Sequence, residues 1–256
     1  MRNPLKDKLK RGEVAIGTFV ALGHPDVTER LSVMGFDWLL LDGEHGPLGL
    51  ETMQIMMQAM RGDTCVPIFR VEWNDPVIIK RALDLGAGGV LIPWVNTREE
   101  AIAAVQACKY PPQGIRGCGP RRAALIHENY IMTANDNILV AVQIETVDAV
   151  KNIDEILAVD GVDVVYIGPT DLCMSMYGLP AKWGDAKYME AFDTVVKAAK
   201  KAGKPAGIYA TSQNIEWAID KGFTFPSVDQ ADVFLAAGAA AALKKAKDAI
   251  AKKKAL

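Results

Sequence analysis

Residues 139–144 read Leu-Val-Ala-Val-Gln-Ile, and residues 162–167 read Val-Asp-Val-Val-Tyr-Ile. Between them, Thr146–Leu157 has a helical pattern, and Gly161 stands just before the second run, where glycine suits the end of a helix. Both runs are almost continuously apolar, which is typical of strands that helices bury on both faces. The stretch therefore predicts a strand, a helix and a second, parallel strand.

The same unit recurs along the whole chain. Short apolar runs occur at Ala15–Ala21, Asp37–Leu41, Pro67–Val71, Gly89–Ile92, Leu139–Ile144, Val162–Ile167, Pro205–Tyr209 and Phe223–Val228. Further helical segments are predicted at Pro25–Met34, Leu50–Met60, Pro76–Leu85, Thr97–Cys108 and Tyr188–Ala202. Eight parallel units in about 230 residues fit an α/β fold of the TIM (β/α)8 barrel type better than a doubly wound sheet.

No linker rich in serine, glycine or proline divides the 256 residues, so we expect a single domain over 1–256 with the barrel at about 13–230. The longest insertion, Tyr110–Asn137, is predicted to form loops and a short helix over one barrel mouth. The tail Ala231–Leu256 is rich in alanine and lysine and predicts an extra C-terminal helix at about 231–254, closing the barrel with an amphipathic face.

Composition excludes several classes of partner. Lys and Arg number 29 against 31 Asp and Glu, a net charge of -2, so no basic field favours nucleic acid. The longest apolar runs are too short to span a bilayer and no charged-then-apolar leader opens the sequence, which predicts a cytoplasmic protein without a membrane partner.

No C-x-x-C pair occurs, and we expect reduced thiols at Cys65, Cys108, Cys118 and Cys173.

Polar side chains follow several predicted strands at their C-terminal ends, where barrel enzymes build their active sites. Strand two runs into Asp42–Gly46, strand three ends near Arg70, strand five carries Gln143 and Glu145, and strand six runs into Gly168–Asp171. All are predicted to meet at one mouth of the barrel.

Glu145 and Asp171 follow adjacent strands and offer carboxylate oxygens with room for water and substrate. Such a pair suits a hard divalent cation such as Mg²⁺ or Mn²⁺. An acid after a strand is also a common helix N-cap, and this alternative stays open for each residue.

The turn Gly168-Pro169-Thr170-Asp171 offers the backbone N–H groups of Thr170 and Asp171 at a helix start, a cradle for a carboxylate or phosphate, whereas Pro169 has no N–H to give. Arg70 ends an apolar strand and so needs a carboxylate partner or an anionic ligand. A structural salt bridge to Asp42 or Asp84 is the alternative for Arg70.

His45 stands three residues after Asp42, close enough for the carboxylate to fix the imidazole tautomer and raise its basicity. The two residues form a candidate acid–base pair. Lysines are missing from the predicted strand ends, which disfavours Schiff-base chemistry.

Five ordered motifs resemble the HpcH/HpaI aldolase family. They are the segments Phe36–His45, Trp73–Pro76, Tyr110–Gly117, Gln143–Thr146 and Tyr166–Leu172. The resemblance implies a TIM barrel, a divalent metal (Mg²⁺, Mn²⁺ or Co²⁺) and pyruvate-type chemistry. It also implies a homo-hexamer, a trimer of dimers that exchange their C-terminal helices.

Position by position, the resemblance implies metal ligands at Glu145 and Asp171, an enolate-stabilising arginine at Arg70, and a proton-handling His45 oriented by Asp42. The family glutamine that lines the metal site corresponds to Gln143. The pyruvate carboxylate is expected at the turn formed by Gly168, Pro169, Thr170 and Asp171.

The implied reaction is reversible cleavage of a 4-hydroxy-2-oxo acid, such as 4-hydroxy-2-oxoheptanedioate or a 2-keto-3-deoxy sugar acid, into pyruvate and an aldehyde. Phe19 and Pro226–Gln230 depart from the family pattern, which leaves the aldehyde open. Two alternatives remain: a lyase acting on citramalyl-CoA or malyl-CoA, and a catalytically silent barrel that binds ligands or acts as a scaffold. A scaffold would have no need of five polar residues at one mouth.

Overall fold

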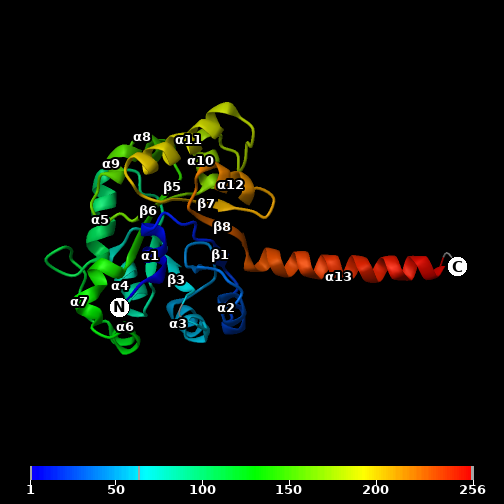
Figure 1. The fold of residues 1–256 in the computed structure, drawn as a ribbon, viewed down its shortest axis with the longest axis horizontal. Coiled ribbons are helices and arrows are strands. Elements are labelled where there is room, and N and C mark those ends of the chain that lie inside the picture. The colour runs from blue at the N-terminus through cyan, green and yellow to red at the C-terminus, as the bar shows by residue number, and fades with distance from the viewer. Residues whose placement is uncertain (1, 63, 255–256) are drawn as a thin grey trace.

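The computed structural model describes residues 2–62 and 64–254, which form a closed barrel of eight parallel strands paired in chain order (Figure 1). The strands are β1 (Gly17–Val20), β2 (Trp38–Asp42), β3 (Val66–Arg70), β4 (Gly89–Ile92), β5 (Leu139–Ile144), β6 (Val164–Ile167), β7 (Ala206–Ala210) and β8 (Phe225–Gln230). Each overlaps one predicted apolar run, so the predicted TIM barrel is confirmed.

Helices pack around the barrel, and the last of them in the chain extends away from it (Figure 1). They are α1 (Pro4–Lys10), α2 (Pro25–Ser32), α3 (Leu50–Ala59), α4 (Pro76–Asp84), α5 (Arg98–Cys108), α6 (Arg121–Ile126), α7 (Tyr130–Asn137), α8 (Val147–Lys151), α9 (Ile153–Leu157), α10 (Pro169–Tyr177), α11 (Ala186–Lys201), α12 (Ile215–Lys221) and α13 (Ala231–Lys254). The single helix predicted at Thr146–Leu157 is two helices, because Asn152 leaves helical geometry between α8 and α9 and donates to the Asn96 carbonyl.

The strands have two buried faces, as their apolar sequences predict. Side chains such as Trp38 and Leu40 fill the barrel interior, while their neighbours Leu39 and Leu41 pack against the helices. Trp38 stacks on Phe225 at 4.4 Å between ring centroids. A side chain at position 17 would collide with the Trp38 indole, which is why glycine is required there.

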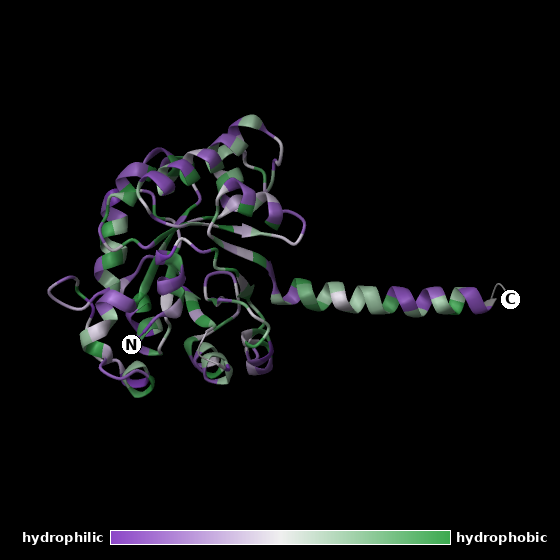
Figure 2. Cartoon of the chain, in the orientation of Figure 1, coloured by the Kyte–Doolittle hydropathy of each residue, from purple (hydrophilic) through white to green (hydrophobic). Residues whose placement is uncertain are grey.

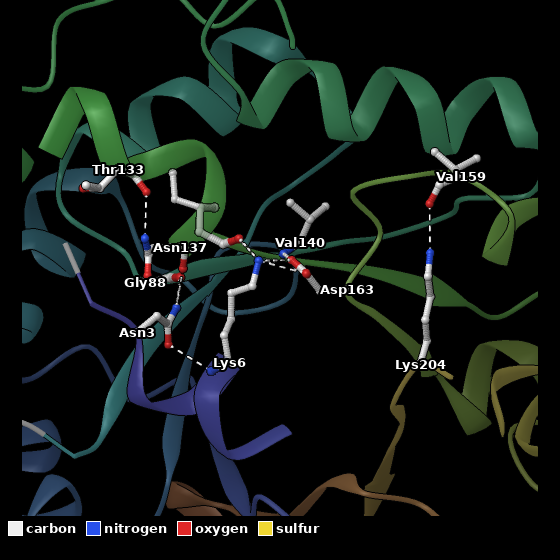
Figure 3. A network of polar contacts seen from close by, with 10 residues as sticks. Asn3, Lys6, Gly88, Thr133, Asn137, Val140, Val159, Asp163 and Lys204 are labelled. Carbon is white, nitrogen blue, oxygen red and sulfur yellow. Dashed lines mark hydrogen bonds and ion pairs between the residues drawn. The ribbon is translucent and has the colours of Figure 1, made fainter. Parts of the chain in front are cut away.

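Helix α1 closes the N-terminal end of the barrel and is tied to it by polar contacts (Figure 3). The Asn3 amide donates to the carbonyls of Gly88 and Asn137, both at 2.8 Å, and the Lys6 ammonium pairs with Asp163 at 2.8 Å. Since Asn137 ends the insertion Tyr110–Asn137, its two helices α6 and α7 lie at this end of the barrel. The C-terminal ends of the strands remain open at the other.

Helix α13 runs away from the barrel instead of closing it (Figure 1). Only its beginning is anchored, where Phe234 stacks on Phe36 at 6.3 Å, and Leu235, Leu243 and Ile250 are exposed. Figure 2 shows hydrophobic residues dominating its first half and hydrophilic ones its far end. The extra C-terminal helix predicted at about 231–254 is confirmed as α13, but the expectation that it closes the barrel is wrong, because its apolar side chains form no continuous stripe facing its own barrel.

No helix within residues 2–62 and 64–254 combines the length and the apolar character that crossing a membrane requires.

Strand register places the polar residues side by side. Asp42 is the register partner of Arg70 across β2 and β3, and Ile144 is that of Ile167 across β5 and β6. The next residues along β5 and β6, Glu145 and Gly168, therefore stand next to each other at the C-terminal end.

Candidate active site

A cavity of about 290 Å³ opens at the C-terminal ends of the strands. It is lined by Phe19, His45, Arg70, Gln143, Tyr166, Gly168, Pro169, Thr170, Asp171, Tyr209 and Gln230. Seven predicted site residues are among them, and the other two, Asp42 and Glu145, lie just behind, bonded to Arg70 and Gln143. A larger cavity of about 680 Å³ lies at the N-terminal end, remote from these residues.

Arg70 is held by two acids. Its Nε and Nη2 donate to Asp42 at 2.8 and 2.7 Å, and its Nη1 lies 3.0 Å from Oε2 of Glu44. Burial alone would lower the pKa of Arg70, but hydrogen bonding to Asp42 and the charges of both acids raise it instead. The salt bridge to Asp42, which was the alternative for Arg70, is present, yet a guanidinium has five N–H donors and the hydrogen bonds to Asp42 use two of them.

Glu44 was given no role by the sequence, although it stands between Asp42 and His45. Its side chain is largely buried, and burial raises its pKa more than the charges of Arg70 and His45 lower it. Its position between two predicted site residues was the only sequence signal for a role. That the Glu44 side chain turns toward Arg70 is evident only from the fold.

His45 differs from its predicted geometry. The Asp42 carboxylate accepts the backbone N–H of His45 at 3.3 Å rather than a hydrogen bond from its imidazole, because Arg70 occupies that carboxylate. The imidazole is mostly exposed, and its Nε2 lies 3.8 Å from Oε2 of Glu44. The expected contact between the Asp42 carboxylate and the His45 ring is therefore absent from the described contacts, while His45 still lines the cavity.

Glu145 is fully enclosed, with 1% of its surface exposed. Its Oε1 accepts the backbone N–H of Trp94 at 2.8 Å, and its Oε2 accepts from the Gln143 amide. Burial raises the pKa of Glu145 to about 7, and the charges of Glu44 and Asp171 act in the same direction. A buried carboxylate near other acids is in an environment that a cation would relieve.

Trp94 has a left-handed backbone, with φ at 55°, which is rare for a bulky residue. This conformation accompanies the N–H bond from Trp94 to Glu145, and the Asn96 amide donates to the Trp94 carbonyl at 2.9 Å. Thr146, which follows Glu145, donates to Asn96. Two adjoining loops thus hold the carboxylate in place.

The turn at Gly168–Asp171 starts α10, with Gly168 at the N-cap and Pro169 at the first helical position. The first N–H groups of a helix have no partner within it and are free for an anionic ligand. A Cβ atom on Gly168 would lie 2.5 Å from Oε2 of Glu145 and 2.8 Å from Nε2 of Gln143. Glycine is therefore required by close approach, not by an unusual φ.

Gly168→Ala is expected to lower activity about a hundredfold while the barrel stays folded, because the added methyl group displaces the Glu145 carboxylate by a fraction of an ångström or more. Steady-state kinetics and circular dichroism on the same sample check this. As a control, Gly49→Ala has open space around its Cβ and should keep full activity. Wild-type kinetics in Gly168→Ala would contradict the proposed tightness of the site.

Oxygen donors are the ligands that these residues offer. Glu145 and Asp171 supply carboxylates, and Oε1 of Gln143 is buried with no hydrogen-bond partner in the described part of the chain. Across residues 2–62 and 64–254, no three His, Cys, Asp or Glu side chains cluster as a metal cage. Two carboxylates with positions left for water and substrate nevertheless fit a hard divalent cation, which often keeps several waters.

Three wall residues were missed by the sequence: Tyr166, Tyr209 and Gln230. Tyr166 and Tyr209 lie within apolar runs where nothing distinguishes them from core aromatics. Tyr166 hydrogen-bonds to Ser227 at 2.9 Å, and burial raises its pKa, which keeps the phenol neutral. Phe19, expected near the aldehyde, is also in the wall, and the Arg70 guanidinium lies 5.1 Å from its ring centroid.

Comparison with known proteins identifies the family of the chain. The family model described as HpcH/HpaI aldolase/citrate lyase matches residues 15–235. The chain is 42% identical to a 4-hydroxy-2-oxo-heptane-1,7-dioate aldolase of Klebsiella pneumoniae, covering 94% of this chain and 92% of that protein. It is 40% identical to a 5-keto-4-deoxy-D-glucarate aldolase of Escherichia fergusonii, covering 88% and 90%.

Among solved structures, an HpcH/HpaI aldolase/citrate lyase family protein from Burkholderia cenocepacia superposes with a TM-score of 0.91 at 30% identity, covering 96% of this chain and 99% of that one. The relatives named as aldolases match nearly their full lengths, so the chain is an enzyme of the aldolase type, a carbon–carbon lyase. The chain belongs to the HpcH/HpaI aldolase/citrate lyase family.

Proposed function

We propose that the chain is a divalent-metal-dependent aldolase that reversibly cleaves a 4-hydroxy-2-oxo acid into pyruvate and an aldehyde. One observation carries the proposal: Glu145, Asp171, Arg70 and His45 meet at the same end of the barrel. The relatives named for a heptane-1,7-dioate and a deoxy-glucarate support 4-hydroxy-2-oxoheptanedioate and 2-keto-3-deoxy sugar acids as substrate candidates.

Glu145 and Asp171 would hold the metal, with Gln143 beside them; Mg²⁺, Mn²⁺ and Co²⁺ are all candidates for this oxygen donor set. When bound, such a cation supplies Lewis-acid stabilisation of the negative charge that develops on the pyruvate enolate. The N–H groups of Thr170 and Asp171 at the start of α10 receive the pyruvate carboxylate.

Arg70 stabilises the enolate oxygen with the donors that Asp42 and Glu44 leave free. Its side chain is 8% exposed and already fixed by both acids, so little reorganisation is needed as charge develops. A preorganised donor in a largely water-excluded site is worth more than the same donor in water. This assigns Asp42 a supporting role through Arg70 and through the backbone of His45.

His45 takes the proton from the 4-hydroxyl group through a water, as the carbon–carbon bond breaks. Its imidazole lines the cavity and remains exposed to water, which suits a base that exchanges protons with solvent. Glu44 is the acid near its Nε2, and Asp42 holds its backbone.

His45→Ala is expected to lower aldol cleavage about a hundred- to ten-thousandfold, since this is the range for general base assistance. Hydrogen exchange at the pyruvate methyl group should fall less, because that reaction involves no 4-hydroxyl proton. Pyruvate release and deuterium uptake by NMR measure the two reactions. Equal losses in both would count against the hydroxyl as the proton source.

The exposed helix α13 and the free cysteines bear on the assembly and the cellular location of the protein. We expect one barrel domain whose exposed α13, with Leu235, Leu243 and Ile250 uncovered, is exchanged with a partner subunit in a homo-hexamer built as a trimer of dimers. A single helix extending into water lacks the tertiary packing that normally stabilises helices. The four cysteines are free, which favours a reducing, cytoplasmic compartment.

A substrate panel tests the proposed activity. Purified protein with added Mg²⁺, Mn²⁺ or Co²⁺ is incubated with 4-hydroxy-2-oxoheptanedioate, a 2-keto-3-deoxy sugar acid and citramalyl-CoA, each of which releases pyruvate on cleavage, and pyruvate is measured with a coupled dehydrogenase. We expect metal-stimulated pyruvate release from at least one hydroxy-oxo acid. Turnover of the CoA thioester alone would contradict the proposal.

A further inference from the structure

A second cavity of about 560 Å³ adjoins the active-site cavity. Pro169, Thr170 and Tyr209 line both cavities, so they form the shared wall. The second cavity extends outward between the loop that joins α10 to α11 and the loop that joins β7 to α12. A ligand anchored at Gly168–Asp171 therefore has space to extend past Thr170.

Aromatic rings form one side of this cavity. The Trp183 indole meets Tyr188 at 5.7 Å and Trp217 at 5.5 Å, both edge to face, and stacks on Phe192 at 5.6 Å between ring centroids. Although it touches these three rings, Trp183 is 46% exposed. A rigidly held indole with one side open is suited to stack against a flat or apolar group.

The loop that carries Trp183 is held in place by Asp185. The Tyr177 hydroxyl donates to Asp185 at 2.6 Å, and Lys182 pairs with the same carboxylate at 3.1 Å. The indole is thus fixed before a ligand arrives, which lowers the entropic cost of binding.

The described residues that line the second cavity include no acid, lysine, arginine or histidine. Its polar side chains are neutral, and Thr211 and Asn214 hydrogen-bond to each other. A carboxylate placed there would lose water without gaining a cation, which is costly. An apolar tail carries no charge, so it would enter the cavity without this cost of lost hydration.

We propose that this cavity binds the aldehyde-derived end of the substrate and selects uncharged aldehydes with an apolar, planar tail. The inference rests on the proposed aldolase function and specifies its second substrate. It disfavours the dioate candidate, because cleavage of 4-hydroxy-2-oxoheptanedioate would leave 4-oxobutanoate, an aldehyde that carries a carboxylate.

Aldol addition of pyruvate to benzaldehyde and to 4-oxobutanoate, with Mn²⁺ present, tests the assignment. Wild-type kcat/KM should favour benzaldehyde, and Trp183→Ala should lower the benzaldehyde value about five- to tenfold through KM, as expected for a lost stacking contact. Deuterium uptake into pyruvate should be unchanged in this variant. Trp73→Ala is the matched control, since Trp73 is 53% exposed near the same end of the barrel but lines neither cavity.

A gain-of-function variant gives a second, independent test of the aldehyde assignment. Gln213 is exposed and lines the cavity, so Gln213→Lys supplies the missing cation and should raise kcat/KM for 4-oxobutanoate about tenfold relative to benzaldehyde. Preference for 4-oxobutanoate in the wild type, or equal effects of Trp183→Ala and Trp73→Ala, would overturn the inference while leaving the aldolase function intact. Absence of deuterium uptake by the metal-loaded wild type would instead overturn both.

Discussion

Arg70→Ala is expected to lower both aldol cleavage and pyruvate hydrogen exchange about a thousandfold. In the proposed mechanism the two reactions share an enolate that Arg70 stabilises as a preorganised cationic donor, so both should lose the same stabilisation. The change also leaves Asp42 and Glu44 buried without their cation, which costs about 3–5 kcal/mol of folding stability. The thermal midpoint should fall while the secondary structure is retained.

Arg70→Lys separates charge from geometry. A lysine keeps the positive charge but cannot reproduce the two parallel bonds to Asp42. We expect partial recovery of stability with little recovery of activity, measured by thermal unfolding and by NMR of deuterated pyruvate. If Arg70→Ala kept the exchange rate of the wild type, Arg70 would be a structural ion-pair partner only.

Glu145→Ala is expected to abolish metal binding within the measurable range, lowering affinity by at least about a hundredfold and both reactions with it. The change also leaves the Trp94 N–H and the Gln143 amide without their acceptor, so we expect a loss of about 1–3 kcal/mol of folding stability with the secondary structure retained.

Asp148→Ala provides the control for Glu145→Ala. Asp148 lies three residues further along, but its side chain is exposed and pairs with the exposed Lys151 at 3.1 Å. Titration of Mn²⁺ into both variants by calorimetry should show the wild-type affinity for Asp148→Ala and none for Glu145→Ala. Equal affinities would place the metal elsewhere.

Much of this site was predictable because parallel strands share a direction. Once the apolar runs are identified as strands of one barrel, the residues that follow these strands must meet at one end. Glu145 and Gly168 directly follow the neighbouring strands β5 and β6. The requirement for a partner to Arg70 also followed from its place in an apolar strand. These inferences need only strand order and direction.

Side-chain pairing was not predictable to the same degree. Asp42 has two possible partners, His45 three residues away and Arg70 on the next strand. Strand register places Asp42 beside Arg70, and its carboxylate therefore pairs with the guanidinium. Glu44 lies in the loop just after β2 and also pairs with Arg70, which strand register alone does not predict. The course of α13 was also not predictable, since its alanine-rich sequence specifies a helix but not which surface covers that helix.

The central claim is that oxygen donors of Glu145 and Asp171 hold a divalent cation that makes pyruvate acidic. Its most direct measurement is deuterium uptake into the pyruvate methyl group by protein dialysed against EDTA, before and after Mn²⁺ is restored, with metal content verified by mass spectrometry. We predict no uptake above background without metal and full recovery with about one Mn²⁺ per chain. Undiminished uptake by verified metal-free protein would contradict the account.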